Sequence, residues 1–377
     1  MALSTDHVVA NPGEVLARAK DLAEPALRRA AAGLPAGVAE VVAHHMGWSP
    51  QPGAGASSAG DGGKAVRAAL ALLGARAAGA PEQCGVAGAV AVELVHNFTL
   101  LHDDIMDGDR ERRHRPAAWV RFGVPRALLA GDALLALSLR VLTGARSPYA
   151  HRAAEMLTAT LQDLVHGQSL DLEFTGRAHV SVDEYRTMAH GKTGSLLGCA
   201  CAVGAVLAGA PSATVLHLQR FGEHLGLAFQ CADDLLGIWG DPARTGKPVG
   251  SDLLAGRRTL PVLAALADPG PAGLRLAELL AAPETAAPET AAPETAAPET
   301  AAPETAGPET AAPETAGPRA AVTLAALVEQ AGGRAFAEDE GRRQLAEATR
   351  HLEAAELPPE EHAELTALAA TVLGRDR

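Results

Sequence analysis

The stretch that decides the fold is residues 100–116, which read Leu-Leu-His-Asp-Asp-Ile-Met-Asp-Gly-Asp-Arg-Glu-Arg-Arg-His-Arg-Pro. Asp103 and Asp107 are four residues apart, so on a helix they share one face, with Asp104 beside them. The residues before them are apolar, and carboxylates crowded at the end of an apolar helix repel one another and are costly to bury. A divalent cation resolves both problems, and clustered oxygen ligands suit Mg²⁺. The stretch therefore predicts a long apolar helix that ends at a magnesium site.

Two arginines follow these carboxylates directly. Arg112 and Arg113 form a fork suited to phosphate oxygens. The alternative interpretation is a solvated helix end of mixed charge. It explains neither the apolar residues before the carboxylates nor the sharp change from negative to positive side chains. The pattern therefore favours a phosphorylated ligand.

A second acidic pair stands in residues 229–241, Phe-Gln-Cys-Ala-Asp-Asp-Leu-Leu-Gly-Ile-Trp-Gly-Asp, where Asp233 and Asp234 end another long apolar helix. By itself this pair is also compatible with an irregular helix C-terminus. If it faces the first motif across a cavity, the two acidic groups can hold a cluster of Mg²⁺ ions and, through them, a diphosphate.

Further cations stand in small-residue settings. Lys64 and Arg67 lie three residues apart in Gly-Gly-Lys-Ala-Val-Arg at 62–67, which places both on one face. Lys192 and Lys247 stand in Gly-Lys-Thr and Gly-Lys-Pro. Each is a weak signal alone, since most lysines are solvated. Together with the two arginines they predict a metal-free site for a second diphosphate.

Composition limits the classes of function. The chain has 377 residues, of which 281–315 are seven pentapeptides of the type Ala-Ala-Pro-Glu-Thr, one with Gly as its second residue. The formal net charge is −13, and the repeat supplies seven Glu, so the rest of the chain is only mildly acidic. This charge argues against a general nucleic-acid binder, which needs a basic face. Hydrophobic residues make up 47%, with alanine the commonest, which favours a large helical core.

The cellular compartment follows from cysteines and apolar runs. The four cysteines form no Cys-x-x-Cys pair, which argues against a disulfide framework or a structural zinc site and fits a reducing cytosol. The N-terminus lacks the basic start and apolar run of a signal peptide. No Asp, Glu, Lys or Arg occurs between Lys192 and Arg220, a length that could span a bilayer, but Pro211 interrupts a stretch rich in Ala and Gly. We therefore expect a cytoplasmic protein without a membrane span, in which this stretch is a buried helix.

Apolar residues recur at helical spacing along most of the chain, and no convincing alternating strand occurs. Pro or Gly separates most of the predicted helices. These helices cover 13–33, 36–47, 64–79, 85–107, 124–143, 150–176, 182–208, 212–238, 257–268, 319–331, 333–354 and 359–373.

The remaining segments are predicted to be irregular. Residues 49–63 are rich in Gly, Pro and Ser and predict a flexible loop. The repeat has Pro at every fifth position and no large apolar residue, which predicts a disordered, partly polyproline-II insert. We expect one all-α domain, made of 64–280 and 318–377, with N-terminal helices and the loop in 1–63 and the insert at 281–317.

These motifs together resemble the polyprenyl diphosphate synthases, the short-chain trans isoprenyl diphosphate synthases. The likeness runs from about residue 60 to the C-terminus, the repeat excepted. It rests on Asp-Asp-x-x-Asp with its trailing Arg-Arg-x-x-Pro, Gly-Gly-Lys-x-x-Arg, Gly-Gln-x-x-Asp-Leu at 167–172, Lys-Thr at 192–193, Phe-Gln-x-x-Asp-Asp, and the block at 246–261. The resemblance implies an isoprenoid-synthase helical barrel, a homodimer, facing aspartate motifs and about three Mg²⁺ ions held with the substrate.

The resemblance also implies roles for individual residues. The metal ligands would be Asp103, Asp107 and Asp233, supported by Asp104 and Asp234. The cations on the allylic diphosphate would be Lys192, Lys247 and Arg112. The ligands of isopentenyl diphosphate would be Lys64, Arg67, His96 and Arg113. The residues at the reacting centre would be Thr193 and Gln230.

The implied reaction is a head-to-tail condensation. Metal ions and cations draw charge onto the allylic diphosphate, the C–O bond ionises, and the double bond of isopentenyl diphosphate attacks the carbocation. A proton is then lost to the departed diphosphate. The protein supplies electrostatic stabilisation and a dry cavity more than a base.

Three positions depart from the family's pattern. Gly237 stands where the second motif has its last Asp, which predicts a looser third metal site that Asp241 could assist. Arg257 replaces a common Lys, which keeps the charge and changes the geometry. Ala68 replaces a frequent Pro, which affects the start of a helix.

Product length is predicted from the residues before the first motif. Thr99 and Phe98 lie four and five residues before Asp103, and on a helix both lie below the metal site. One aromatic at this level, with no insertion between Asp104 and Asp107, resembles the family's pattern for the C20 product, geranylgeranyl diphosphate. The C15 product is the leading alternative.

Two other functions remain open from the sequence. A class I terpene cyclase shares the fold and the acidic motif but usually lacks the Gly-Gly-Lys-x-x-Arg site. A non-catalytic prenyl-diphosphate-binding subunit typically loses the first aspartate motif. Some relatives are thought to be cargo of protein nanocompartments. A nanocompartment shell is therefore a further predicted partner, and the repeat would be the segment that binds it.

Overall fold

The computed structural model describes residues 10–49, 65–113, 115–175, 177, 179–241, 249–281 and 316–374. Several predictions concern residues outside these ranges. They are the two lysines Lys64 and Lys247, nearly all of the 49–63 loop, and the repeat from residue 282 to 315.

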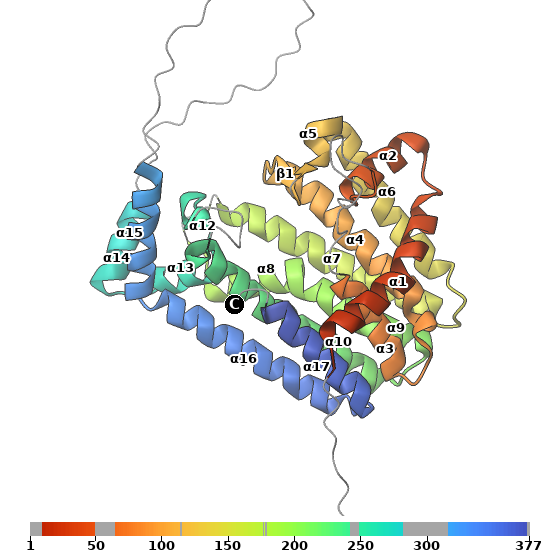
Figure 1. Cartoon of the computed structure of the whole chain (residues 1–377). Coiled ribbons are helices and arrows are strands. Elements are labelled where there is room, and N and C mark those ends of the chain that lie inside the picture. Colours follow the sequence, from red (N-terminus) through yellow and green to blue (C-terminus); the bar gives the residue numbers. More distant parts are fainter. Residues whose placement is uncertain are drawn as a thin grey trace, which may run out of the picture. The chain divides into compact units, whose positions relative to one another are not determined.

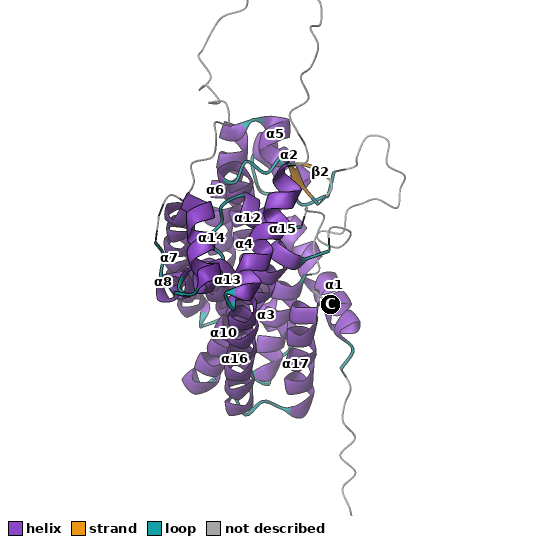
Figure 2. Ribbon diagram, turned by 90° about the vertical axis from the view of Figure 1, so that its left-hand side faces the viewer, coloured by secondary structure: helices purple, strands orange, loops and turns teal. Residues whose placement is uncertain are grey.

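Nearly all of the described chain is helical (Figures 1 and 2), which confirms the all-α fold class. The helices of the first half are α1 (Pro12–Ala31), α2 (Ala36–His45), α3 (Val66–Ala77), η1 (Glu82–Gly85), α4 (Val86–Met106), α5 (Ala118–Phe122), α6 (Val124–Thr143) and α7 (Ala150–Thr175). Those of the second half are α8 (Val182–Ala189), η2 (His190–Gly194), α9 (Ser195–Ala208), α10 (Ser212–Trp239), α12 (Ser251–Leu254), α13 (Leu260–Leu266), α14 (Pro271–Ala281), α15 (Ala316–Gln330), α16 (Gly333–Ala354) and α17 (Pro359–Gly374).

The structure corrects the sequence prediction at several points. A short antiparallel hairpin, β1 (Glu111–Arg112) with β2 (Arg115–Pro116), forms where no strand is predicted, because two-residue strands leave no alternating pattern. The helix predicted over 182–208 is interrupted by a π-helical turn at η2. Helix α13 begins three residues later than predicted, because Pro261 is suited to a first helical turn. Helices α5, α12 and α14 are additional.

The described residues form two compact units. The first contains residues from 1–173, 183–232 and 339–377. In it α4 packs against α6 and α9, and α3 packs against α9. A Cβ atom at Gly204 would overlap the carbonyl oxygen of Ala71, so the glycine allows α3 and α9 to touch through their backbones. This unit holds the larger hydrophobic core and the end of α4.

The second unit contains residues from 174–182 and 233–338. It comprises the end of α10 and helices α12 to α15, and α14 and α15 flank the repeat. Each helix of this unit contributes one or two side chains to a separate hydrophobic core. These are Ile238, Leu253, Val262, Ala265, Leu276, Ala325 and Val328.

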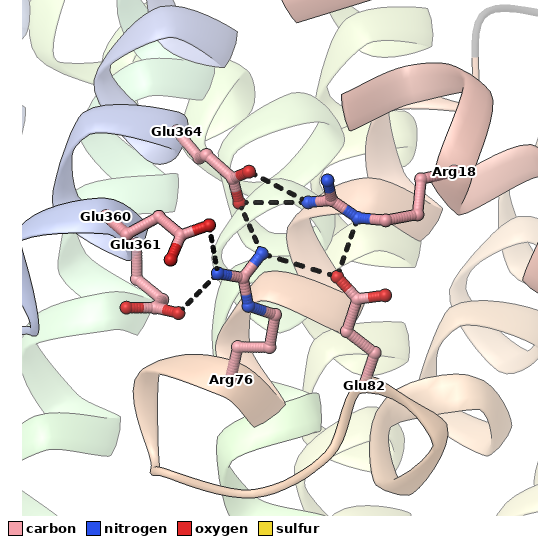
Figure 3. Close-up of polar contacts among 6 residues, drawn as sticks. All are labelled: Arg18, Arg76, Glu82, Glu360, Glu361 and Glu364. Atoms are coloured by element: carbon pink, nitrogen blue, oxygen red, sulfur yellow. Dashed lines mark hydrogen bonds and ion pairs between the residues drawn. The ribbon is translucent and has the colours of Figure 1, made fainter. Parts of the chain in front are cut away.

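A buried ion network holds α17 to α1, α3 and η1 within the first unit (Figure 3). Arg76 pairs with Glu361 at 2.6 Å and with Glu364 at 2.8 Å. Arg18 pairs with Glu364 at 2.9 Å and with Glu82 at 2.8 Å. These contacts fix the C-terminal helix to the N-terminal helices.

Two stretches are long and apolar enough to cross a membrane, Glu82–Met106 and Val182–Ala208. Most of each stretch is buried inside the fold. In α9, all 13 residues from Ser195 to Leu207 are buried, as expected for the charge-free stretch after Lys192. Both stretches therefore have the burial of core helices.

Candidate active site

The first carboxylate cluster lies at the C-terminal end of α4. The N–H of Asp107 donates to the carbonyl of Asp103 at 2.8 Å, so the last helical turn continues and keeps both residues on one face. Asp103 is half-buried and Asp107 is exposed. Burial raises the pKa of Asp103 to about 6, with Lys192 opposing this rise and Asp107 adding to it. The ionised carboxylate is thus under-compensated, which suits a site that takes up a cation.

Asp104 has a different environment from its neighbours. Its side chain is 1% exposed, and its Oδ1 atom accepts hydrogen bonds from Nε of Arg112, at 2.8 Å, and from Nη2. Among the described residues, its Oδ2 atom has no hydrogen-bond partner. Asp104 therefore orients Arg112, and its predicted role in supporting the metal ligands stays a prediction.

Lys192 reaches the same cluster from the π-helical turn. Its Nζ atom donates to Oδ2 of Asp171 on α7. A Cβ atom at Gly167 would overlap the backbone at Lys192, and one at Gly191 would lie 2.5 Å from the carbonyl oxygen of Asp163. The two glycines therefore let α7 and η2 meet closely enough for this contact.

Asp171 is a site residue that the sequence analysis did not select, although it quoted the motif at 167–172. Its charge contributes to the raised pKa of Asp103, together with Asp107. The structure thus gathers Asp103, Asp107, Asp171 and Lys192 at one place. Its place in the motif Gly-Gln-x-x-Asp-Leu is the sequence feature that could have identified Asp171 as a site residue.

Thr193 and Gln230, which the resemblance assigns to the reacting centre, contact each other. Oγ1 of Thr193 donates to Oε1 of Gln230 at 2.9 Å. A Cβ atom at Gly226 would lie 2.7 Å from Cα of Gly194, so α10 and η2 are in backbone contact here. The pair joins α10 to the turn that carries Lys192.

A basic cluster lies beside the carboxylates. Burial, followed by the charges of Arg67 and Arg113, lowers the pKa of His96 well below its ordinary value. Burial and the charges of Arg113 and Arg112 lower the pKa of His45 to about 3. The arginines thus concentrate positive charge around neutral imidazoles, an arrangement suited to an anionic group. His45 was not selected from the sequence.

Glu93 is the acidic member of this cluster. Burial raises its pKa, although Arg67 opposes the rise. Its Oε1 atom accepts a hydrogen bond from the backbone N–H of Ala68 at 3.2 Å. Proline has no N–H, so the replacement of the family's frequent Pro by Ala68 gives this chain a hydrogen bond that Pro would lack.

The second acidic pair belongs to the second unit. The buried carboxylate of Asp234 accepts a hydrogen bond from the N–H of Leu260 at 2.7 Å, at the start of α13. Asp233 is exposed on α10. A Cβ atom at Gly237 would overlap the carboxylate of Asp252, which gives a steric reason for the glycine in the last position of the motif. That Asp233 faces the first motif stays a prediction.

The residues predicted to set product length lie on α4. Phe98 is 8% exposed in the core and packs edge-on against His102, with the ring centroids 4.9 Å apart. The hydroxyl of Thr99 donates to the carbonyl of His96 at 2.8 Å.

The donor set fits Mg²⁺ only in part. Within the described ranges, no three His, Cys, Asp or Glu side chains converge on a point that could hold a metal. Asp103 and Asp107 offer hard oxygen atoms on one face, and Mg²⁺ commonly takes one or two carboxylates and completes its shell with substrate phosphates. The arrangement therefore suits an ion that binds together with a diphosphate.

Known proteins are similar to this chain in sequence and in fold. The family described as Polyprenyl synthetase matches residues 54–293. A (2E,6E)-farnesyl diphosphate synthase of Mycobacterium tuberculosis is 40% identical over 371 residues, 98% of this chain and 95% of the relative. A geranylgeranyl diphosphate synthase of the same species is 48% identical over 270 residues, 71% of this chain and 77% of the relative. The crystal structure of a polyprenyl synthetase from Streptomyces coelicolor has a TM-score of 0.83 at 43% identity, covering 96% of this chain and 99% of that one.

Proposed function

Because this chain belongs to the polyprenyl synthetase family and is a prenyltransferase that makes short-chain prenyl diphosphates, we propose that it joins isopentenyl diphosphate to an allylic diphosphate and releases mainly geranylgeranyl diphosphate. The observation that carries the proposal is the convergence of Asp103, Asp107 and Lys192 beside a cluster of arginines and neutral histidines. In one part of the site burial disfavours the ionised form of Asp103, which suits a bound cation, and the arginines of the other part suit a bound anion.

In this proposal the two parts bind different substrates. Asp103 and Asp107 would hold Mg²⁺, on which the family depends, and Lys192 and Arg112 would contact the oxygens of the allylic diphosphate. Bound Mg²⁺ supplies the charge that stabilises diphosphate as a leaving group. Asp104 and Asp171 orient these two cations through their hydrogen bonds. The family's motifs would add Lys247 and Asp233 to this part.

The second substrate would bind to the basic cluster without metal. Arg67 and Arg113 act on His96 and would hold this substrate with it, and Lys64 would join them because it precedes Arg67 in the glycine-rich motif. The Thr193–Gln230 pair holds the turn of Lys192 against α10 and would lie at the reacting centre. Buried apolar helices exclude water, which protects a carbocation from capture.

A product of C20 is favoured by the single aromatic one turn below Asp103. Phe98 is braced by His102, so it can form a fixed floor for the growing chain. The similar proteins include both farnesyl and geranylgeranyl diphosphate synthases, so C15 is the competing product.

The decisive experiment incubates the chain with labelled isopentenyl diphosphate, an allylic primer and Mg²⁺, and identifies the products. We expect C20 from the parent and longer products from Phe98→Ala. Phe221→Ala, which removes a buried ring on α10, is the matched control and should leave product length unchanged. A dominant C15 product in the parent would refute the C20 assignment, and a released hydrocarbon would indicate a cyclase.

We further propose a homodimer in the cytoplasm. Helix α6 exposes Val124, Leu128 and Leu129, the last at 61%, an apolar face that a second copy could cover. Light scattering of the purified chain tests this state. A nanocompartment shell as partner of the repeat is supported only by the resemblance.

A further inference from the structure

A cavity of about 220 Å³ lies between the end of α2 and the β1–β2 hairpin. Its described lining contains five basic side chains and no carboxylate: His44, His45, Arg112, Arg113 and Arg115. One water molecule occupies about 30 Å³ in the liquid, so the cavity has room for several water molecules. A cavity with this lining is suited to an anion larger than a single ion.

Arg115 is the unusual member of the lining. It is 9% exposed, and its Nη2 atom donates to the carbonyl of Ser49 at 3.2 Å. In the described part of the chain, its Nε atom has no partner and no carboxylate pairs with it. It also lies directly opposite Arg112 in the hairpin, where like charges are unfavourable. Asp104 compensates Arg112, whereas Arg115 keeps a buried charge that is costly without an anion.

The two adjacent histidines of the lining also differ in whether their ring nitrogens have hydrogen-bond partners. Nδ1 of His44 accepts from Nη1 of Arg121 at 3.3 Å, and Nε2 donates to the carbonyl of Pro116 at 2.9 Å, so both ring nitrogens are used. His45 is 7% exposed, and its Nε2 atom has no hydrogen-bond partner among the described residues. A buried polar atom without a partner costs free energy that a bound ligand can recover.

The hairpin tip shows backbone strain. Arg113 has a φ of +53°, in the left-handed region that a side chain other than glycine seldom adopts. Such strain persists where the surroundings impose it, and it concentrates at ligand sites. The strained tip places Arg113 in the lining beside Arg115.

We propose that Arg115 and His45 are two further ligands of the metal-free diphosphate site that contains Arg113. Arg115 occupies a variable place in Arg-Arg-x-x-Pro, and His45 lies outside every motif identified above. The assignment of this diphosphate to isopentenyl diphosphate rests on the proposed function, because Arg113 both lines the cavity and is assigned there to that substrate. A free inorganic diphosphate offers the same chemistry, and the measurements below separate the two sources.

The test uses the full chain and the variant Arg115→Gln, which keeps a donor for the carbonyl of Ser49 and removes the charge. Calorimetry with inorganic diphosphate in EDTA excludes the magnesium site. We expect Kd to rise about 10-fold to 100-fold, as for the loss of a charge-assisted hydrogen bond. Arg115→Lys should lose less, because it keeps the charge. His45→Ala should weaken binding by about fivefold, because it removes a neutral hydrogen bond.

Two control variants match these changes. His217→Gln alters a histidine on α10 that contacts His351 and does not line the cavity. Arg126→Gln removes a guanidinium that pairs with Glu40 on α2 and does not line the cavity. Neither should change the Kd for diphosphate.

The outcomes separate the two proposals. A KM for isopentenyl diphosphate that rises together with Kd assigns the group to the substrate. An unchanged KM with a raised Kd assigns it to free diphosphate, and both results support the site. Unchanged Kd and KM in a folded Arg115→Gln chain overturn the site and leave prenyl transfer standing. Arg115-dependent binding in a parent that does not elongate an allylic primer overturns the function and leaves the site standing.

Discussion

The ion network under α17 and the charged end of α4 use similar residues in opposite ways. In the network, Arg18 and Arg76 are surrounded by carboxylates at hydrogen-bond distance (Figure 3). At the end of α4, Asp103 and Asp107 crowd one face while the arginines gather in a separate cluster. The network therefore satisfies its charges internally, whereas at the site burial disfavours the charged form of Asp103, and the arginines lower the pKa of His45 and of His96.

The pKa directions express this difference. Burial works against the charge of Arg76, but Glu364, Glu360 and Glu361 outweigh it and raise the pKa of that guanidinium, which favours its charged form. Burial raises the pKa of Asp103 to about 6, which disfavours its charged form. Charges in the first cluster stabilise the fold, and charges in the second reduce stability in favour of binding.

The largest expected effect separates activity from stability. Asp103→Asn should reduce kcat by about a thousandfold or more, because it removes a ligand of the ion that stabilises the leaving group. The free energy of unfolding should not fall, since the ionised carboxylate is disfavoured in the folded state. Steady-state kinetics and chemical denaturation measure the two quantities, with exposed Asp132→Asn on α6 as control. Normal turnover of a folded Asp103→Asn protein would show that the metal ligand lies elsewhere.

The reverse pattern is expected in the network. Arg76→Ala should lower the free energy of unfolding by about 3 kcal/mol, because Glu361 and Glu364 stay buried without this partner. Specific activity of the folded fraction should be unchanged. Arg28→Ala breaks an exposed pair with Glu24 and should cost about 0.5 kcal/mol. Equal losses in the two variants would contradict the distinction between buried and exposed pairs.

A smaller effect distinguishes the two parts of the site. Arg67→Ala should raise KM for isopentenyl diphosphate about tenfold and leave KM for the allylic substrate nearly unchanged, because it removes one charge-assisted contact. Lys64→Ala should act in the same direction. Initial rates with each substrate varied in turn give both constants. A rise confined to the allylic KM would mean that the two diphosphate sites are exchanged.

The smallest effect concerns the repeat. Replacing 281–315 with a short Gly-Ser segment should leave kcat and Tm almost unchanged, because an insertion without apolar anchors adds little closure entropy. Calorimetry and the standard assay test both. A large loss of either would show that the repeat contributes to the folded body.

The local features of the site could be predicted from the sequence. The four-residue spacing of Asp103 and Asp107 decides that they share a helix face, and the apolar run before them predicts α4. The identity of the family also follows, since its motifs are short and contiguous. The hairpin escaped prediction because strands of two residues have no periodicity.

The amino-acid sequence is enough to predict which residues carry charge, most of the helices and the family. Which charges come into contact depends on how the chain folds. Arg18 and Glu364 pair across 346 positions, and Asp171 reaches Lys192 because two glycines let their backbones touch. The same holds for Arg115 and His45, which share a cavity only because α2 lies against the hairpin. Helical periodicity is a property of neighbouring residues, whereas the environment of a charge depends on side chains that folding brings together from distant parts of the chain.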